Sequence, residues 1–227
     1  MNRYLNLNNI SLLNMGMFTM NMLNAIEIMG TIAFAISGSM VAIRKRVDLF
    51  GVLLLGMTTA VGGGIVRDVL LGNTPPRIFS SMTILLIAFT SSLIVFLVAY
   101  FAHEKYQRNH LQVDRINNVF DAFGLGLFTV TGMKVAEECG IEHVVILIFF
   151  GAVTGIGGGL IRDLMVNEIP FVLKKHIYAV ASIAGGLSYF MLKECAVKDT
   201  VAVGISILIV VVLRILATVF RWNLPRV

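Results

Sequence analysis

Two segments of the chain place three consecutive glycines shortly before an Arg-Asp pair, and both lie inside long apolar stretches. The first motif comprises Gly62, Gly63, Gly64, Arg67 and Asp68, and the second comprises Gly157, Gly158, Gly159, Arg162 and Asp163. Charged side chains inside an apolar stretch are costly and mark candidate ion or substrate pathways. Backbone carbonyls that are freed from a helix can replace part of the hydration shell of a cation. These residue types therefore favour binding or passage of an ion over catalysis.

Two interpretations of the glycine triplets compete. Each glycine in a helix interior costs about 1 kcal/mol relative to alanine. The triplets could let neighbouring helices approach closely, as small residues do in membranes. Alternatively, the helices bend or unwind at Gly62–Gly64 and Gly157–Gly159, which is tolerated only where the backbone is buried in protein or lines a watery cavity. Three adjacent glycines weaken the backbone more than packing requires, so we favour a bend that faces a polar path.

Charged residues within the apolar stretches form two groups, and the members of each group lie at similar depth. Glu27 lies about one turn into its stretch, and Arg67 lies about one turn before the end of the next stretch, which returns to the same face. We therefore expect Glu27 to pair with Arg67, and Asp121 to pair with Arg162 in the same way. The charged clusters expected at the two mouths comprise Glu27, Arg67, Asp68, Asp121, Arg162 and Asp163. They could guard a pathway at both ends or could only set helix register, and both interpretations stay open.

Hydroxyl side chains recur on the same stretches. Ser37 and Thr131 occupy matching positions, as do Thr59 and Thr154. A hydroxyl in a membrane helix often bonds the carbonyl four residues earlier, but the matched placement favours pore lining. Arg214 lies about two turns from the end of the last stretch, where we expect it to snorkel or to contact another subunit.

The overall composition requires a membrane to position these residues. Of 227 residues, 57% are hydrophobic and 14% are charged, whereas soluble domains carry about 25% charged residues. Seven apolar blocks of about 20 residues each match the thickness of a bilayer. We predict an all-α membrane protein with spans at Asn24–Ile43, Gly51–Leu71, Ser80–Phe101, Ile116–Ala136, His143–Val166, Lys174–Leu192 and Asp199–Phe220. Residues 1–23 are expected to form an extracytoplasmic tail.

Lys and Arg residues outside the predicted spans are about twice as frequent on one side as on the other, which orients the chain. The bias places the C-terminus in the cytoplasm and the N-terminus outside. The charges cluster in short links and form no basic face, so a nucleic-acid partner is not expected.

The chain contains an internal repeat. Residues 56–68 and 151–163 match at an offset of 95, and Glu27 matches Asp121 at an offset of 94. Each copy holds three predicted spans, an odd number, so the second copy must enter the membrane from the opposite face. This predicts two inverted three-helix repeats at residues 24–102 and 116–192, joined by a cytoplasmic linker at 103–115. A seventh helix at 199–220 lies outside the repeat.

Catalytic and metal-binding motifs are not apparent. The histidines show no metal-ligand spacing, and no nucleophile elbow or phosphate loop is present. We therefore expect no enzyme activity, no cofactor and no metal. Cys139 and Cys195 both map to the outer side, where two free thiols are expected and a disulfide is left open.

The doubled Gly-Gly-Gly-x-x-Arg-Asp motif in a three-plus-three-plus-one helix plan resembles the prokaryotic branch of the trimeric intracellular cation (TRIC) channel family over about residues 24–220. It is also similar to the small bacterial membrane proteins that are labelled as a putative glycine transporter domain. The resemblance implies a homotrimer with one pore in each protomer, bent at the glycine triplets and passing monovalent cations, chiefly potassium. The chain lacks the long lysine-rich C-terminal tail of the animal members, which favours a bacterial-type plasma (inner) membrane.

Three functions from different classes fit the inverted repeat. The first is a cation channel, and the second is a secondary transporter for glycine or a similar small solute. The third is a structural or lipid-binding scaffold in the bilayer. Potassium flux and glycine uptake, measured in parallel, would distinguish them.

Overall fold

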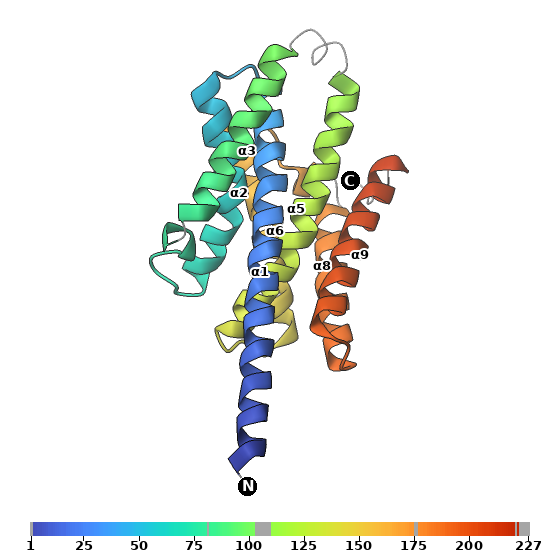
Figure 1. Ribbon diagram of the computed structural model, residues 1–227. Coiled ribbons are helices and arrows are strands. Elements are labelled where there is room, and N and C mark those ends of the chain that lie inside the picture. Colours follow the sequence, from blue (N-terminus) through green and yellow to red (C-terminus); the bar gives the residue numbers. More distant parts are fainter. Residues whose placement is uncertain (1, 81, 103–109, 175–176, 221, 223–227) are drawn as a thin grey trace.

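The computed structural model describes residues 2–80, 82–102, 110–174, 177–220 and 222, with side chains from residue 22 onward except at residue 110. All the regular structure in these residues is helical. The long helices are α1 (Asn2–Arg44), α2 (Leu49–Leu70), α3 (Met82–Phe101), α5 (His110–Glu138), α6 (Val144–Met165), α8 (Ile177–Glu194) and α9 (Asp199–Val219), with two short helices, η1 (Arg77–Ser80) and α7 (Phe171–Lys174). Figure 1 shows the long helices as one bundle, with α3 and α9 on opposite flanks of α1 and α5.

Six of the described helices are long and apolar enough to cross a membrane, where seven spans were expected. They are the Met22–Arg44 part of α1, α2, α3, the Leu111–Glu138 part of α5, α6 and α9. The remaining predicted span corresponds to α8, which has 18 residues, contains Gly185 and Gly186 and ends on Lys193 and Glu194. Its weaker apolar character separates it from the other six.

The N-terminal segment differs from the expected tail. Helix α1 begins at Asn2 and not near residue 24, and its first part projects beyond the other helices (Figure 1). The segment contains Leu and Met residues between its asparagines and has no proline, the residue that most strongly interrupts a helix. Residues 110–115 of the predicted linker belong to α5, whereas residues 103–109 lie outside the described part of the chain.

At the centre of the bundle, two phenylalanine rings meet, and each ring also packs against a glycine of the other helix. The rings of Phe34 on α1 and Phe128 on α5 lie 5.2 Å apart, centroid to centroid. A Cβ atom at Gly124 would overlap the ring of Phe34, and one at Gly30 would lie 3.0 Å from the ring of Phe128. Each glycine thus makes room for the phenylalanine of the other half. Reciprocal contacts of this kind are characteristic of a two-fold relationship.

Helices α2 and α6 cross in close backbone contact at the glycine triplets. A Cβ atom at Gly63 would overlap the carbonyl of Thr154, and one at Gly158 would overlap the carbonyl of Thr59. Since Thr59 lies beside Gly158 while Gly63 lies beside Thr154, the two helices run antiparallel where they cross.

The helices do not unwind at the crossing, which excludes one of the two forms of interruption that were considered. The helical backbone continues without interruption through Gly62–Gly64 and through Gly157–Gly159. Glycine is needed at the contact because any side chain would separate the two helices. Close packing, the alternative interpretation of the triplets, therefore accounts for their first two glycines.

Candidate ion pathway and its two charged ends

The Arg67-Asp68 pair closes a turn at one end of the bundle. Arg67 donates from Nε to Oδ1 of Asp68 at 2.8 Å, and both side chains are buried. Oδ2 of Asp68 accepts a hydrogen bond from the backbone N–H of Arg77 at 2.9 Å, at the start of η1. Asp68 thus neutralises Arg67 and caps the short helix that follows α2.

The Arg162-Asp163 pair repeats this arrangement at the end of α6. Arg162 donates from Nε to Oδ1 of Asp163 at 2.9 Å, and Oδ2 of Asp163 accepts from the backbone N–H of Phe171 at 2.7 Å. The second bond caps α7 as Asp68 caps η1. Both Arg-Asp pairs therefore stabilise the turn that follows their helix, a role the sequence analysis did not identify.

The two ends of the bundle differ in the further contacts that Arg67 and Arg162 make. Nη1 of Arg162 donates to Oδ1 of Asp121 at 2.8 Å and to Oγ of Ser37 at 2.7 Å, so the structure contains the expected contact between Arg162 and Asp121. The direct ion pair expected between Glu27 and Arg67 is absent from the described residues. Arg67 is bound by its neighbour Asp68 instead, through Nη2 as well as Nε.

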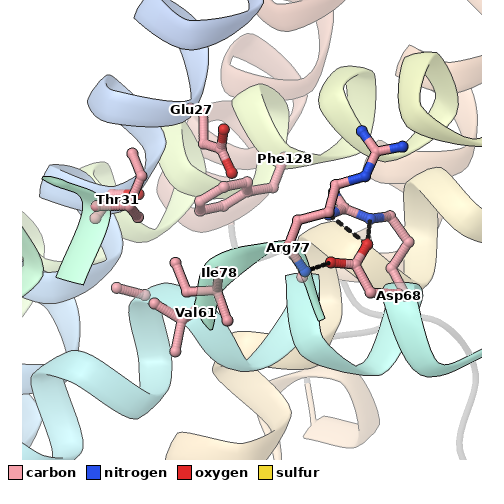
Figure 2. Close-up of a pocket in the computed structure, with 11 residues that line it drawn as sticks. Glu27, Thr31, Val61, Asp68, Arg77, Ile78 and Phe128 are labelled. Atoms are coloured by element: carbon pink, nitrogen blue, oxygen red, sulfur yellow. Dashed lines mark hydrogen bonds and ion pairs between the residues drawn. The ribbon is translucent and has the colours of Figure 1, made fainter. Parts of the chain in front are cut away.

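Glu27 lines a cavity beside Arg67. The cavity is small, with a volume of about 20 Å³ that is enough for about one water molecule, and is lined by Glu27, Thr31, Ala60, Val61, Gly64, Arg67, Asp68, Arg77, Ile78, Ile84 and Phe128. Figure 2 shows the Glu27 carboxylate next to the Phe128 ring, with Asp68 and Arg77 to one side. A Cβ atom at Gly64 would meet only Nη2 of Arg67, at 3.7 Å, so the third glycine of this triplet leaves the surface of α2 open to the cavity.

Three of the four matched hydroxyls bond the backbone of their own helices, as the alternative interpretation held. Thr59 and Thr154 each donate to the carbonyl four residues earlier at 2.6 Å, and Thr131 does so at 2.9 Å. These bonds satisfy the hydroxyls within their own helices. Only Ser37 reaches a charged residue, because its hydroxyl accepts from Arg162.

Arg214 does not snorkel as expected. It is buried on α9, with Nη2 3.5 Å from Oδ2 of Asp121 and the guanidinium 4.3 Å above the ring of Tyr178 on α8. The sequence signal was an arginine deep in the last span, but α9 has no counterpart in the repeat that could have indicated its partner. We call Ser37, Asp121, Arg162, Asp163, Tyr178 and Arg214 the Arg162 cluster, and Glu27, Arg67, Asp68 and Arg77 the Arg67 cluster.

Ion pairs at the surface tie the helix ends together. Arg77 on η1 contacts Glu138 at the end of α5 at 3.0 Å. At the other end, Lys45 contacts Glu168, in the loop before α7, at 2.8 Å. The hydrogen bond from Lys45, assisted by the charge of Arg44, lowers the pKa of the Glu168 carboxyl below its ordinary value. These pairs hold η1 and the loop before α7 against the bundle.

Within the described residues, no group of His, Cys, Asp and Glu side chains could hold a metal ion. Cys139 and Cys195 are exposed free thiols in the structure. Beyond the two charged clusters, the described interior also holds the ion pair of Lys134 with Asp199 and the hydrogen bond between Thr129 and Ser182.

Comparisons with known proteins identify the relatives of this chain. Residues 24–100 and 118–194 each match the family model described as glycine transporter, and the two matches start 94 positions apart. A UPF0126 membrane protein from Deinococcus radiodurans is 40% identical over 172 residues, which cover 75% of this chain and 76% of the relative. The UPF0126 membrane protein YvgT from Bacillus subtilis is 35% identical over 201 residues, 88% of this chain and 94% of the relative.

Two solved structures share the fold. One, described as showing the structural basis for conductance through TRIC cation channels, is 38% identical with a TM-score of 0.76 and covers 89% of this chain and 96% of its own. The other, a prokaryotic TRIC channel crystallised in 0.5 M KCl, is 35% identical with a TM-score of 0.80 and covers 89% of this chain and 98% of its own.

Proposed function

Because this chain belongs to the glycine transporter family and has solved relatives that are TRIC cation channels, we propose that it conducts monovalent cations, chiefly potassium, across a membrane. The observation that carries the proposal is the cavity at the Arg67 end. Glu27 has no ion-pair or hydrogen-bond partner among the described residues, and its carboxylate lines this cavity together with Thr31 and Gly64. A carboxylate in a cleft with low-dielectric walls concentrates cations at its mouth.

The proposed path begins at Glu27 and runs along α1 towards the Arg162 cluster. Ser37 lies ten positions after Glu27 on the same helix, which separates the two by about 15 Å along the axis. Along this distance, α1 packs against α2 and α5, and the crossing of α2 and α6 lies beside it. Side-chain oxygens in place of freed carbonyls are the proposed cation ligands, because the helices continue through both triplets.

Further features of the assembly belong to the same proposal. We take α8 as a seventh span, which gives each half three helices and makes the repeat inverted; the reciprocal contacts of Phe34 and Phe128 support this arrangement. We also propose a homotrimer with one pore per protomer in a plasma (inner) membrane, with the N-terminus outside. Exposed apolar side chains on α3, available to lipid or a neighbouring subunit, are Met82, Leu86, Ile94, Val98 and Phe101.

One observation favours a second function, the secondary transporter of a glycine-like solute. The described cavity lies at the Arg67 end, whereas the side chains of Asp121, Arg162 and Arg214 at the other end are at most 2% exposed. Access from one face at a time is the arrangement of an alternating-access transporter. The channel remains our conclusion, because the solved relatives are described as cation channels.

The test is reconstitution of the full chain into liposomes with potassium flux and labelled glycine uptake measured in parallel. A channel dissipates a potassium gradient without saturating, and the Glu27→Gln variant lowers that flux. The exposed Lys193, which pairs with Glu137 at the surface, provides the control variant Lys193→Gln. Saturable glycine uptake with no potassium flux would overturn the proposal in favour of the transporter. If neither glycine uptake nor potassium flux is detected, the structural or lipid-binding scaffold is the remaining function.

A further inference from the structure

The two ends of the bundle differ in one contributor. Helices α2 and α6 supply equivalent Arg-Asp pairs, and α1 and α5 supply the matching acidic residues Glu27 and Asp121. Helix α9 lies outside the repeat and adds a basic side chain, Arg214, at Asp121 alone. At the other end, Glu27 shares its cavity with Arg67 and Arg77, and neither makes an ion pair or hydrogen bond with it among the described residues, since Arg67 binds Asp68 and Arg77 binds Glu138. The presence of Arg214 therefore coincides with the closed end.

Arg214 completes a dense set of charge contacts around Asp121. Oδ1 of Asp121 accepts from Arg162 at 2.8 Å, and Oδ2 faces Nη2 of Arg214 at 3.5 Å. Arg162 also spans to Ser37 on α1 at 2.7 Å, and Arg214 lies over the ring of Tyr178. The side chains of Asp121, Arg162 and Arg214 are at most 2% exposed. A cation that reaches this point meets two guanidinium groups and two carboxylates, Asp121 and Asp163, whose oxygens are already occupied by other partners.

Some polar atoms of the cluster have no protein partner. Nη2 of Arg162, Nε of Arg214 and Oη of Tyr178 are buried and make no hydrogen bond within the described residues. A Cβ atom at Gly159 would lie 3.1 Å from Oη of Tyr178 and 3.6 Å from Nη2 of Arg162, so the glycine keeps the space between them free of side chain. Buried polar groups are normally bonded. Water that enters on opening would bond these atoms and offset part of the cost of separating the ion pairs.

We propose that Arg214 is the gating residue of the pathway: its guanidinium holds the Arg162 end shut by occupying Oδ2 of Asp121. Opening moves Arg214 away from Asp121 and leaves that oxygen facing the path, so the end changes from a barrier of guanidinium groups to a carboxylate that a cation can contact. Opening requires only that Arg214 leaves Asp121, because the charge of Arg162 remains neutralised by Asp163. The inference rests on the proposed cation pathway.

The first measurement is potassium flux through liposomes that contain the full chain. Arg214→Gln removes the charge that faces Oδ2 of Asp121, and we expect flux to rise about tenfold because the closed state loses the contact that occupies this oxygen. Arg214→Lys keeps the charge and should raise flux much less. Lys193→Gln, which removes a surface charge far from the cluster, should leave flux unchanged. Unfolding temperature and elution volume in detergent establish that each variant is folded.

The second measurement reports on opening without relying on conduction. Asn117 lies one turn before Asp121 on α5, is buried, and its Oδ1 makes no bond within the described residues. Asn117→Cys, made with Cys139→Ser and Cys195→Ser, places a single thiol beside the closed end. A small, charged, membrane-impermeant thiol reagent should label it slowly in this background and about tenfold faster with Arg214→Gln. If Arg214→Gln does not fold, Arg214→Lys in the same background is expected to show a smaller increase.

The outcomes separate the gate from the channel. Faster labelling together with higher flux supports both proposals. Faster labelling without any potassium flux supports the gate and overturns the channel. Potassium flux in the original chain, with neither flux nor labelling changed by folded Arg214→Gln, overturns the gate and leaves the channel standing.

Discussion

Asp68 and Asp163 make the same two contacts at opposite ends of the bundle. Each accepts from Nε of the arginine that precedes it, at 2.8 and 2.9 Å, and from a backbone N–H at the start of the next short helix, at 2.9 and 2.7 Å. The repeated Arg-Asp pair is thus first a structural device. What differs between the ends is the further contacts of the arginine, and these differences carry the functional proposals.

Replacement of Asp163 should destabilise the protein strongly. Asp163→Ala leaves Arg162 with less compensation in a buried site and removes the cap of α7, so we expect a loss of about 3–5 kcal/mol in the free energy of unfolding. Asp48→Ala is the matched control, because Asp48 caps α2 at the surface through the N–H of Gly51 at 2.8 Å; its loss should be about 1 kcal/mol. Denaturant unfolding in detergent compares the two, and equal losses would contradict the role of Asp163.

Enlargement of Gly158 should separate two helices. Gly158→Ala puts a methyl group against the carbonyl of Thr59, and we expect a loss of about 1–3 kcal/mol from overpacking. Gly204→Ala on α9 is the control, because nothing lies within 4 Å of its Cβ position; removing a helical glycine there should stabilise by up to about 1 kcal/mol. Unfolding temperatures measure both effects. If Gly158→Ala were as stable as the original chain, close packing would not explain the glycine.

Exchange of charges between Glu27 and Arg67 should not rescue function. Glu27→Lys alone should lower potassium flux, because it places a positive charge in the cavity that a cation enters. Adding Arg67→Glu should lower potassium flux and the unfolding temperature further, since Arg67 is the buried partner of Asp68 and not of Glu27. Flux and unfolding temperature are measured for both single variants and the double variant. Recovery in the double variant would show that Glu27 and Arg67 pair after all.

The pair formed by Lys45 and Glu168 should stabilise the protein only while Glu168 is charged. Because the pKa of Glu168 is lowered in the folded state, its contribution is present above the ordinary carboxyl pKa of about 4.3 and is lost as pH falls through the lower folded value. Glu168→Gln should therefore reduce stability at pH 7, by less than about 1 kcal/mol for a partly exposed pair. The difference from the original chain should vanish at acidic pH. Thermal unfolding at both pH values measures it, and a similar loss in the exposed control Glu142→Gln would contradict the assignment.

The sequence predicted the features that follow from local composition and from the order of residues. Long apolar blocks predict helices, and the structure places a helix over each block, as for Val144–Met165 against the expected 143–166, although α1 and α5 begin earlier, at Asn2 and His110. The repeat was visible because matching residues recur at a constant offset, and the family matches start at that offset. Contact between Asp121 and Arg162 could be predicted because two residues at equal depth on adjoining helices need only rotate towards each other.

The remaining features depended on packing between helices that are distant in the chain. Glu27 and Arg67 lie at similar depth and line the same cavity, but the guanidinium of Arg67 binds its neighbour Asp68. Only the crossing of α2 and α6 shows that Gly63 and Gly158 make room for backbone and do not unwind it. The contact between Arg214 and Asp121 depends on the position of α9, which the repeat does not predict because α9 lies outside it. The sequence by itself thus determined the class, the helices and the duplicated motif, because these follow from residue types and their spacing along the chain. The tertiary structure decided which of the possible charge contacts form, because these depend on the approach of whole helices and on side-chain conformation.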